Sequence, residues 1–466
     1  MHPFEGAVAK MREPGGFFRP DASVYIARAP GRLDLMGGND DYTGGLVFEA
    51  TIREATWAAV QLRADERIVF LNPQVSHEGW KDRVEFCLAD LCDEQHVRTV
   101  VNSAPAIRWT AYVLGNFFFL RQRYPDRVNT GAHVYLESEV PLNKGVSSSA
   151  AVEVAVMKAA ARAYGIDLSG VELAQACQWV ENVIAESACG IMDQITVVLG
   201  DEGYVLPLLC QPCMPAPLIR LPQEIECWAL DSGVRHAVTG IEYEAARAAA
   251  FMGYKLMCDW EGLPVTPDGT SPIPRWTDPR WNGYLANLAP SLFRVCFESR
   301  LPEFTTGAEY LRDGQTHVDP FTTVRPDVTY RIRANTRYAV EENARVQVFA
   351  ELARATGDRK SSRAFILMGE LMYQSHYAYT ECGLAAAATD LLVALALEEG
   401  VANGIYGAKI TGGGAGGTVA VLGRKGAKDA FHRIVSRYAA SQGFTPYVFE
   451  GSSMGADRFG VTVLES

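Results

Sequence analysis

The stretch from residue 131 to residue 165 constrains the fold of this chain more than any other part. It opens as GAHVYLESEVPL, in which apolar and polar residues alternate as they do along a half-buried strand. It continues as NKGVSSSAAVEVAVMKAAARAYG, where small polar residues give way to residues of high helical propensity. We therefore predict a strand, a loop of small polar residues and a helix, so the chain must combine a sheet with helices.

Length and hydrophobicity predict two domains. The chain has 466 residues, of which 48% are hydrophobic, which is too many for one ordinary core and enough for two. A strand-like run ends at Leu230, and we place the domain boundary directly after it. The predicted N-terminal domain covers residues 1–230, and the predicted C-terminal domain covers residues 231–466.

Further elements follow from hydrophobic periodicity and from turn residues. The stretch VYIARAPGRLDLMGGNDDYTGGLVFEATI predicts a strand, a functional loop and a second strand. Helices are predicted over residues 107–121, 171–187 and 425–442, strands over residues 204–209 and 226–230, and a long irregular segment over residues 262–287.

Charge and cysteine usage exclude several classes of function. The net charge of -12 disfavours nonspecific binding to nucleic acid and gives no reason to expect an anionic membrane partner. No run approaches the roughly 18 consecutive apolar residues of a membrane span. Ten scattered cysteines and an opening without an apolar signal core favour a reducing cytoplasm. Cys210 and Cys213 enclose Pro212 and have no matching pair, so we expect a loop there rather than a zinc or redox site.

Three consecutive serines, Ser147, Ser148 and Ser149, stand at the predicted start of the helix. Free backbone N–H groups and the positive end of the helix dipole attract phosphate at such a position. The alternative is an ordinary serine N-cap. The order of residues is not that of a Walker A loop.

A glycine run from Gly412 to Gly417 contains the pattern G-x-G-x-x-G, which alone would suggest a dinucleotide site. The run is followed by the strand-like TVAVL instead of a helix, and IVSRYAA stands where a ribose-binding acid is expected. We reject the dinucleotide site. We expect instead that the glycines let another backbone segment approach closely, and the serine-rich loop is the candidate for that segment.

Glu181 and Asp193 are candidate reactive carboxylates. Glu181 falls on a predicted helix, and Asp193 follows the Cys189-Gly190 turn, where its side chain can face a cleft. A magnesium ion on ATP takes one or two carboxylates, and phosphoryl transfer needs a residue that takes the acceptor's proton. Arg32 could pair with one of them and keep it ionised. The alternative for each acid is a solvated surface charge.

Three segments together resemble the GHMP small-molecule kinases: APGRLDLMGGNDDYTGG, PLNKGVSSSAA and KITGGGAGGT, in this order. The strings CGIMDQ and DSGVRHAVTGIEYEAAR resemble the galactokinase branch. Longer stretches, such as DPFTTVRPDVTYRIRANTRYAVEENARV, resemble the kinase domain of plant L-arabinokinases. The resemblance implies an α+β fold of two domains, the first ribosomal protein S5 domain 2-like and the second ferredoxin-like, with the active site between them.

The same resemblance assigns roles to residues. Asp193 would be the catalytic carboxylate with Arg32 as its partner, and Glu181 and Ser149 would bind Mg2+. The implied nucleotide contacts are Trp109 at the adenine and Asn143, Lys144, Gly145, Ser147, Ser148 and Ser149 in the phosphate loop. The implied sugar contacts are Arg32, Gly38, Asn39, Asp41, Gly190, Asp193 and Tyr243. ATP with Mg2+ and a small-molecule sugar are therefore the expected partners.

Two departures from the galactokinase pattern bear on activity. Gly38 and Asn39 stand where galactokinases carry Glu and His facing the sugar's C6 hydroxyl, and plant arabinokinases also carry glycine at the Glu position. L-arabinose has the ring stereochemistry of galactose without that hydroxymethyl group, so we expect phosphorylation of its anomeric hydroxyl. Asn143 replaces a usual glycine, and asparagine tolerates positive φ.

Several alternatives remain open at this point. The loop could have drifted, with another residue supplying the C6 contact. Within enzymes, the chain could be a galactokinase of relaxed specificity or a uronic-acid 1-kinase, and a free basic residue at the C6 side would favour the latter. Outside enzymes, it could be a catalytically silent sugar sensor.

Overall fold

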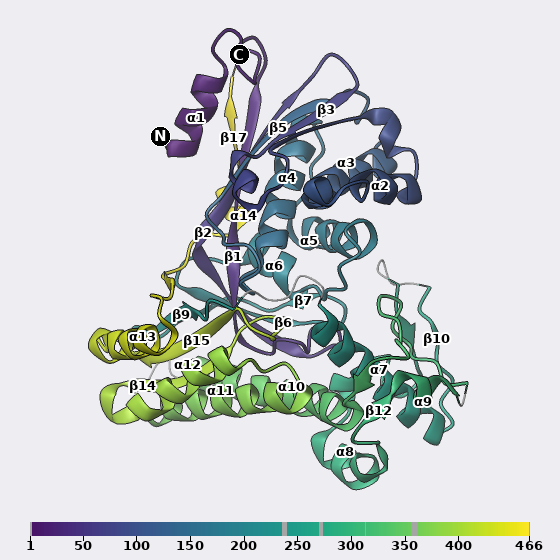
Figure 1. Ribbon diagram of the computed structural model, residues 1–466, viewed down its shortest axis with the longest axis vertical. Helices are drawn as coiled ribbons and strands as arrows, with labels where there is room; N and C mark the ends of the chain where they lie inside the picture. The colour runs from purple at the N-terminus through teal and green to yellow at the C-terminus, as the bar shows by residue number, and fades with distance from the viewer. Residues whose placement is uncertain (1, 235–239, 270–273, 313, 356–361, 466) are drawn as a thin grey trace.

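A large sheet dominates the N-terminal half of the computed structural model, which describes residues 2–234, 240–269, 274–312, 314–355 and 362–465 (Figure 1). Its main path has the order β17-β1-β2-β5-β3-β4, and β6 also pairs with β2 and carries β7 and β8. β3 and β5 pair in parallel. The strands are β1 Val24–Met36, β2 Leu46–Leu62, β3 Arg67–Leu71, β4 Arg83–Cys87, β5 Ala132–Ser138, β6 Tyr204–Leu209, β7 Met214–Pro215, β8 Ile219–Arg220 and β17 Val461–Leu464.

Alternation along β2 places apolar side chains on both faces of this sheet. Ala58 and Val60 lie in the largest core, whereas Trp57 and Ala59 pack on the opposite face with helix α1, Pro3–Met11. The largest core is covered by helices α2 Glu94–Val101, α3 Ala111–Arg123, α4 Ser148–Ala163, α5 Gly170–Trp179 and α6 Met192–Leu199 (Figure 1). The predicted strand, loop and helix of residues 131–165 are confirmed as β5 and α4.

The second sheet has the order β14-β15-β9-β16, with antiparallel pairing throughout the described ladders. Along the chain its strands and helices follow the ferredoxin-like order of strand, helix, two strands, helix and strand, as predicted. The strands are β9 Ile225–Asp231, β14 Ile405–Ile410, β15 Thr418–Arg424 and β16 Val448–Glu450, and the helices are α10 Ile332–Ala355, α11 Ser362–Cys382, α12 Ala387–Glu399 and α13 Lys428–Gln442.

One apolar core joins the two sheets. Phe48 of β2, Phe349 of α10 and Ala420 of β15 belong to the same cluster, so α10 shares one core with both sheets, and α11 adds Met368 to it. The other face of the second sheet buries Trp228 against Phe431 of α13. Because the cluster draws on both sheets, the loops at their edges are held in fixed relation to one another.

A smaller helical layer packs on α10. It contains α7 Ile241–Trp260, α8 Pro290–Cys296 and α9 Gly307–Arg312, with two short ladders, β10 Thr266–Pro267 with β11 Trp276–Thr277 and β12 Thr305–Thr306 with β13 Thr329–Tyr330. The predicted irregular segment 262–287 therefore holds one short ladder, and its residues 270–273 lie outside the described residues. Short 3-10 turns cover Pro73–Glu78, Leu88–Leu91, Pro105–Thr110, Leu285–Asn287, Glu298–Arg300 and Val401–Asn403, and α14 covers Ala456–Phe459.

Three predicted helices are correct in place but not in extent. Residues 105–110 form a 3-10 turn before α3, so the predicted start at residue 107 was wrong. The helix predicted over 171–187 is α only to Trp179 and continues as a π-helical turn, Val180–Ile184. The last helix starts at Lys428, not at residue 425, because Gly426 has a φ of 83°.

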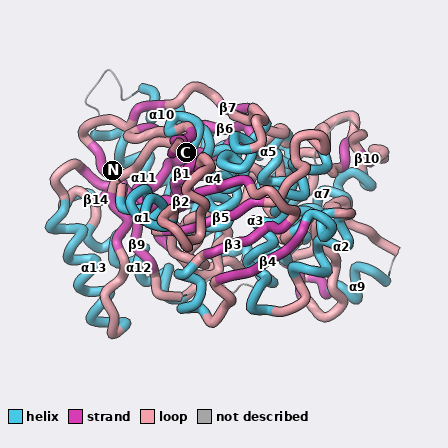
Figure 2. Tube along the Cα trace, turned by 90° about the horizontal axis from the view of Figure 1, so that it is seen from above, coloured by secondary structure: helices cyan, strands magenta, loops and turns pink. Residues whose placement is uncertain are grey.

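The chain crosses between the two sheets more often than a single boundary allows. β9 ends at Asp231 and pairs with β15 and β16, so residues 225–230 lie in the second sheet. β17 returns to pair with β1, which brings the two termini close together (Figure 2). The boundary between residues 230 and 231 stays a prediction. Among the described residues, no helix is long and apolar enough to cross a membrane.

Helix α11 meets β14 backbone to backbone at Gly369, where a β-carbon would overlap the Tyr406 carbonyl. We expect Gly369→Ala to lower the free energy of unfolding by about 1–3 kcal/mol, because the helix has to move away from the sheet. Gly6→Ala is the matched control, since α1 has open space at Gly6 and alanine favours helix by about 1 kcal/mol. Urea unfolding of both variants measures the difference, and equal stability of the two would contradict the close contact.

Candidate functional site

Four loops meet where the two sheets face each other. They are the loop after β1, the loop between β5 and α4, the turn before α6 and the glycine run between β14 and β15. Arg32 of β1 links two of these regions, because its Nη1 donates to the Gly145 carbonyl at 3.0 Å and its guanidinium contacts Asp193 at the start of α6. Gly412 packs against the same carbonyl.

The serine-rich loop has backbone geometry suited to an anion. Asn143, Gly145 and Ser147 have φ values of 58°, 70° and 62°, and α4 begins directly after them. The Ser147 side chain makes no capping bond, so the ordinary N-cap alternative is wrong for it. Its hydroxyl is buried and has no hydrogen-bond partner among the described residues. A buried orphan hydroxyl at a helix N-terminus fits a phosphate oxygen as its partner.

Lys144 of this loop is engaged by the second sheet. Its Nζ lies 2.8 Å from Oδ2 of Asp231, and its carbonyl accepts from the Thr418 hydroxyl at 2.7 Å. The side chain predicted to meet phosphate is therefore held by a carboxylate at the end of β9.

The glycine run forms the turn of a β-hairpin between β14 and β15. Since a strand and not a helix follows it, the rejection of a dinucleotide site agrees with the structure. β-Carbons added at Gly412 and Gly417 would lie 2.8 Å from the carbonyl oxygens of Gly145 and Lys144. The predicted close approach of this backbone to the serine-rich loop is confirmed. Glycine is required because a side chain would separate the two loops.

Arg32 and Asp193 form a buried ion pair. The Arg32 side chain is 2% exposed, its Nε lies 2.9 Å from Asp193 Oδ1, and its Nη2 contacts the same oxygen. Burial opposes the charge, but the carboxylates of Asp193, Glu49 and Asp34 raise the pKa of Arg32 above its usual value. Asp193 keeps 21% exposure at the N-terminus of α6, so it can meet a substrate.

Sequence reasoning missed Glu49, the second carboxylate beside Arg32. Its Oε2 lies 3.5 Å from Arg32 Nε, and Asp34 is its cross-strand partner. Burial and the Asp34 charge raise the pKa of Glu49 well above its ordinary value, although Arg32 opposes this. A charged residue in the otherwise apolar run LVFEATI was the available signal.

The predicted magnesium ligands, Glu181 and Ser149, lie together. Glu181 is 5% exposed on the π-helical turn and accepts a hydrogen bond from Ser149. Burial and the Asp193 charge raise the pKa of Glu181 to about 7, and the hydrogen bonds from Ser149 and Gln194 oppose that rise. Among the described residues, no group of three or more His, Cys, Asp and Glu side chains forms a metal cage. One carboxylate and one hydroxyl fit Mg2+ that is otherwise bound by phosphate and water.

Behind Glu181 lies Glu153, which the sequence analysis did not single out. Gln194 Nε2 bridges the two, at 2.6 Å from Glu181 Oε2 and 3.2 Å from Glu153 Oε2. Burial and the Glu181 charge raise the pKa of Glu153 well above its ordinary value. Glu153 occurs one helical turn after Ser149, and that spacing was the signal in the sequence.

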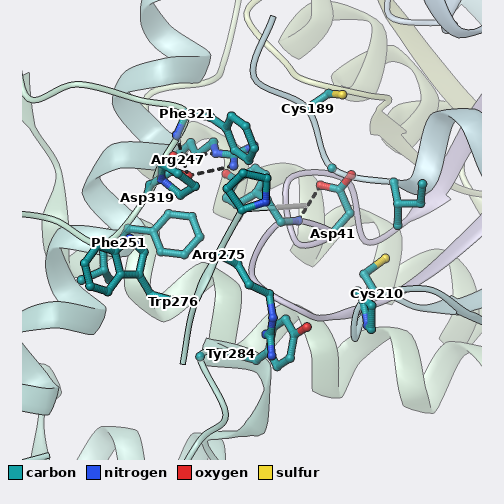
Figure 3. Close-up of a pocket in the computed structure, with 18 of the residues that line it drawn as sticks. Asp41, Cys189, Cys210, Arg247, Phe251, Arg275, Trp276, Tyr284, Asp319 and Phe321 are labelled. Carbon is teal, nitrogen blue, oxygen red and sulfur yellow. Dashed lines mark hydrogen bonds and ion pairs between the residues drawn. The ribbon is translucent and has the colours of Figure 1, made fainter. Parts of the chain in front are cut away.

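Two of the predicted sugar residues line one cavity, and a third contacts its wall. Asp41 (Figure 3) and Gly190 line it. On α7, the Tyr243 ring meets the ring of the lining residue Tyr42 edge-on, with ring centres 5.9 Å apart. A β-carbon at Gly190 would overlap the Asp41 carboxylate. Burial and the Asp193 charge raise the pKa of Asp41 to about 6, while Arg247 lowers it. Part of the motif that precedes Tyr243, residues 235–239, lies outside the described residues.

Other residues that line the cavity with Asp41 were missed by sequence reasoning. Arg247 and Asp319 lie side by side on one wall, across the cavity from Asp41 (Figure 3). Arg275 lies over the ring of Tyr284 at 4.4 Å and pairs with Asp268 at 2.7 Å. Each arginine that lines the cavity is thus paired with an aspartate. The sequence contained a signal for two of these residues. Arg247 ends the galactokinase-like string DSGVRHAVTGIEYEAAR, and Asp319 opens the arabinokinase-like stretch DPFTTVRPDVTYRIRANTRYAVEENARV.

Gly38 and Asn39 lie at the glycine run rather than in the lining of this cavity. A β-carbon at Gly38 would overlap the Asp34 carboxylate and the Tyr379 hydroxyl. Asn39 Nδ2 donates to the Gly413 carbonyl at 3.2 Å, and its buried Oδ1 has no partner among the described residues. The space beside Gly38 is filled by side chains from β1 and α11.

Trp109 lies apart from the loops described above. It is 7% exposed in the core of the N-terminal sheet, and its indole N–H donates to the Lys81 carbonyl at 3.0 Å. Its role at an adenine stays a prediction.

Comparison with known families matches three parts of the chain. Residues 111–201 match the GHMP kinases N terminal domain, residues 350–441 match GHMP kinases C terminal, and residues 17–62 match the galactokinase galactose-binding signature. These ranges contain the serine-rich loop, helices α11 to α13 with the glycine run, and the loop after β1.

Curated relatives fall into two groups. The L-arabinokinase of Arabidopsis thaliana is 34% identical over 97% of this chain, which spans 48% of that protein's length. The galactokinase of Chloroflexus aggregans is 32% identical over 90% of this chain and 89% of its own length.

Solved structures support the fold. The galactokinase of Lactococcus lactis, complexed with galactose, has a TM-score of 0.76 at 20% identity and covers 99% of this chain and 100% of its own. A mevalonate kinase has a TM-score of 0.54 at 14% identity, over 92% of this chain and 99% of its own.

Crowding at Gly38 can be measured through stability. We expect Gly38→Ala to lower the melting temperature, because the Asp34 carboxylate or the Tyr379 hydroxyl has to move. Tyr379→Phe removes that hydroxyl and its 2.8 Å hydrogen bond to the Gly412 carbonyl, at a cost of about 1 kcal/mol.

The double variant is the control for Gly38→Ala. Combined with Tyr379→Phe, the alanine should cost less than it does alone, because one of the two overlapping groups is gone. Additive losses in melting temperature across the four proteins would show that Tyr379 does not crowd position 38.

Proposed function

Because the chain belongs to the galactokinase branch of the GHMP kinases, we propose that it transfers the γ-phosphoryl group of ATP to the anomeric hydroxyl of a neutral sugar, with L-arabinose as the preferred acceptor. The products are ADP and the sugar 1-phosphate. The observation that carries the reaction type is the buried Arg32–Asp193 pair at the meeting point of the serine-rich loop, the glycine run and the Asp41 cavity.

Asp193 is the group that we assign to the acceptor hydroxyl. Its carboxylate is partly exposed beside the cavity, and it accepts from Arg32 on one oxygen, Oδ1. The other oxygen can orient the hydroxyl and take its proton as the new bond to phosphorus forms. The guanidinium of Arg32 fixes the Asp193 carboxylate through their ion pair, and its positive charge stabilises negative charge on the phosphoryl group in transit.

The serine-rich loop is assigned to the phosphates of ATP. Its positive-φ backbone and the N-terminus of α4 point N–H groups into the loop, and the orphan hydroxyl of Ser147 can donate to a phosphate oxygen. Magnesium, when bound with ATP, offsets the negative charge of the phosphates. Glu181 and Ser149 would hold it, because the Glu181 carboxylate is buried beside the serine-rich loop and accepts a hydrogen bond from the Ser149 hydroxyl.

Sugar choice rests on two observations. The cavity presents Asp41 as a carboxylate, and both arginines in its lining are paired with aspartates, which disfavours an anionic uronic acid. Gly38 has no side chain and lies with Asn39 at the glycine run, outside the cavity lining, so neither residue supplies a contact to a C6 hydroxyl. A pentose loses nothing by this, and the 34% identity to a plant L-arabinokinase agrees with it. A galactokinase of relaxed specificity is the second candidate, favoured by the galactokinase relatives.

A substrate panel tests the proposal. Purified protein with MgATP should phosphorylate L-arabinose with a kcat/KM at least about tenfold above that for galactose. The ratio kcat/KM for galacturonate and glucuronate should be about 100-fold below that for L-arabinose, because like charges would meet at Asp41. A preference for galactose would favour the second candidate, a preference for a uronate would remove the charge argument, and no turnover with any sugar would support a silent sensor.

Asp193→Asn tests the mechanism. The amide keeps the shape of the side chain but cannot take a proton, so we expect kcat to fall by at least about 1,000-fold while MgATP binding, measured by calorimetry, is largely retained. Glu202→Gln, an exposed carboxylate shortly after the end of α6, is the matched control and should keep full activity. An active Asp193→Asn protein would remove Asp193 from the reaction.

A further inference from the structure

Arg247 is the cation that faces the predicted sugar contacts from the C-terminal half of the chain. It lies on α7, one helical turn after Tyr243, and is 3% exposed. Its Nε and Nη2 donate to the two oxygens of Asp319 at 2.8 and 2.9 Å, in a two-pronged ion pair. Asp319 is equally buried, and its Oδ2 also accepts from the Thr322 hydroxyl at 2.7 Å.

Aromatic rings fix the guanidinium in place. Its central carbon lies 4.9 Å from the centre of the Tyr42 ring, 5.4 Å from Phe321 and 5.8 Å from Phe251. Tyr42 directly follows Asp41, and the Tyr42 backbone N–H donates to the Asp41 carboxylate at 2.9 Å. A shift of Arg247 would therefore be transmitted to Asp41 through the Tyr42 ring.

Arg247 and Asp41 line the same cavity from opposite walls (Figure 3). Arg32 and Asp193 carry the proposed phosphoryl transfer, and Arg247 takes no part in that step. A buried ion pair of this kind is expensive to desolvate and is weak grounds for stability alone. Its place in the wall of the sugar cavity calls for a functional explanation.

We propose that Arg247, locked by Asp319, is a positioning residue of the sugar site that holds Tyr42 in place and keeps Asp41 in the ionised form that accepts hydrogen bonds from sugar hydroxyls. This inference rests on the proposed function, because Asp41 is taken as a sugar contact. Asp319 also has a role in this proposal. Its negative charge partly offsets that of the Arg247 guanidinium, so the cavity wall does not attract anionic ligands.

The groups that face Asp41 come from several elements. Asp193 on α6 opposes its ionisation, and Arg247 on α7 favours it. The remaining neighbours are Asp40 and Tyr42 on its own loop, Tyr243 on α7, Cys189 before α6 and Cys210 after β6. Burial raises the pKa of each of these five groups well above its usual value, so none of the tyrosines or cysteines carries charge near neutral pH. Arg275 lines the same cavity but is paired with Asp268, so Arg247 is the cation that offsets Asp193 at Asp41.

The sign of the effect follows from these charges. Asp41, with a pKa of about 6, is protonated below that pH, so sugar binding should weaken as the pH falls through 6. Arg247→Met removes the offsetting cation and should move this acidic midpoint upward by at least about half a pH unit. Asp319→Asn keeps the cation and removes its counter-charge, so the midpoint should move downward.

These opposite directions separate a positioning role from a structural one. Both variants break the same ion pair, so a merely structural pair would move the midpoint in the same direction in both or in neither. Arg247→Lys keeps the charge and should return the midpoint close to that of the wild type. Lys158→Met, which breaks the buried pair of Lys158 with Asp457 outside the cavity, is the matched control and should leave the midpoint unchanged.

The experiment is the pH dependence of kcat/KM for L-arabinose and galactose, from pH 5 to 8, with sugar binding by calorimetry as a readout without turnover. Opposite shifts in Arg247→Met and Asp319→Asn support the inference. If the wild type binds neither sugar, the proposed function falls and the inference with it. If the wild type binds sugar and Arg247→Met keeps its midpoint, the inference alone is overturned.

Discussion

The rest of the site depends on the contacts of the buried Arg32 guanidinium. A guanidinium that is 2% exposed must find partners within the protein, and it finds them on three separate elements: Asp193 of α6, the Gly145 carbonyl and Glu49 of β2. The same contacts that satisfy the charge bring the reactive carboxylate beside the serine-rich loop. The contacts that stabilise the buried charge of Arg32 are therefore the same contacts that position the site.

Backbone contact between the two halves of the chain comes next. The glycine run of the second sheet lies against the carbonyls of Lys144 and Gly145, at distances that a side chain would prevent. Thr418 and Asp231, which pair at the ends of the central strands β15 and β9, also bind Lys144. Because these are backbone and ion-pair contacts around one loop, the phosphate region is assembled from residues as far as 274 positions apart in the chain.

Charge balance distinguishes the two ends of the site. Around Arg32, the carboxylates of Asp34, Glu49 and Asp193 outnumber the cations of Arg32 and Lys409. Burial raises the pKa of Glu49 and of Glu181, and the charge of Asp34 at the first and of Asp193 at the second adds to the rise. Around Asp41, the cavity walls carry arginines that are each paired with an aspartate. The first arrangement suits a bound cation with phosphates, and the second suits a neutral polyol.

The sequence by itself determined the local units, namely the strand, loop and helix of residues 131–165 and the glycine loop that leads into a buried strand, because periodicity, turn residues and short motifs are local. The residues left open which carboxylate pairs with Arg32; the family resemblance implied Asp193, which lies 161 positions away. Tertiary structure alone decided that Gly38 is crowded by Tyr379, that Glu49 and Glu153 lie behind the reactive groups, and that Arg247 and Asp319 form a wall of the cavity. These depend on contacts between residues far apart in the chain, which no local pattern encodes, since packing fixes them only once both sheets share a core.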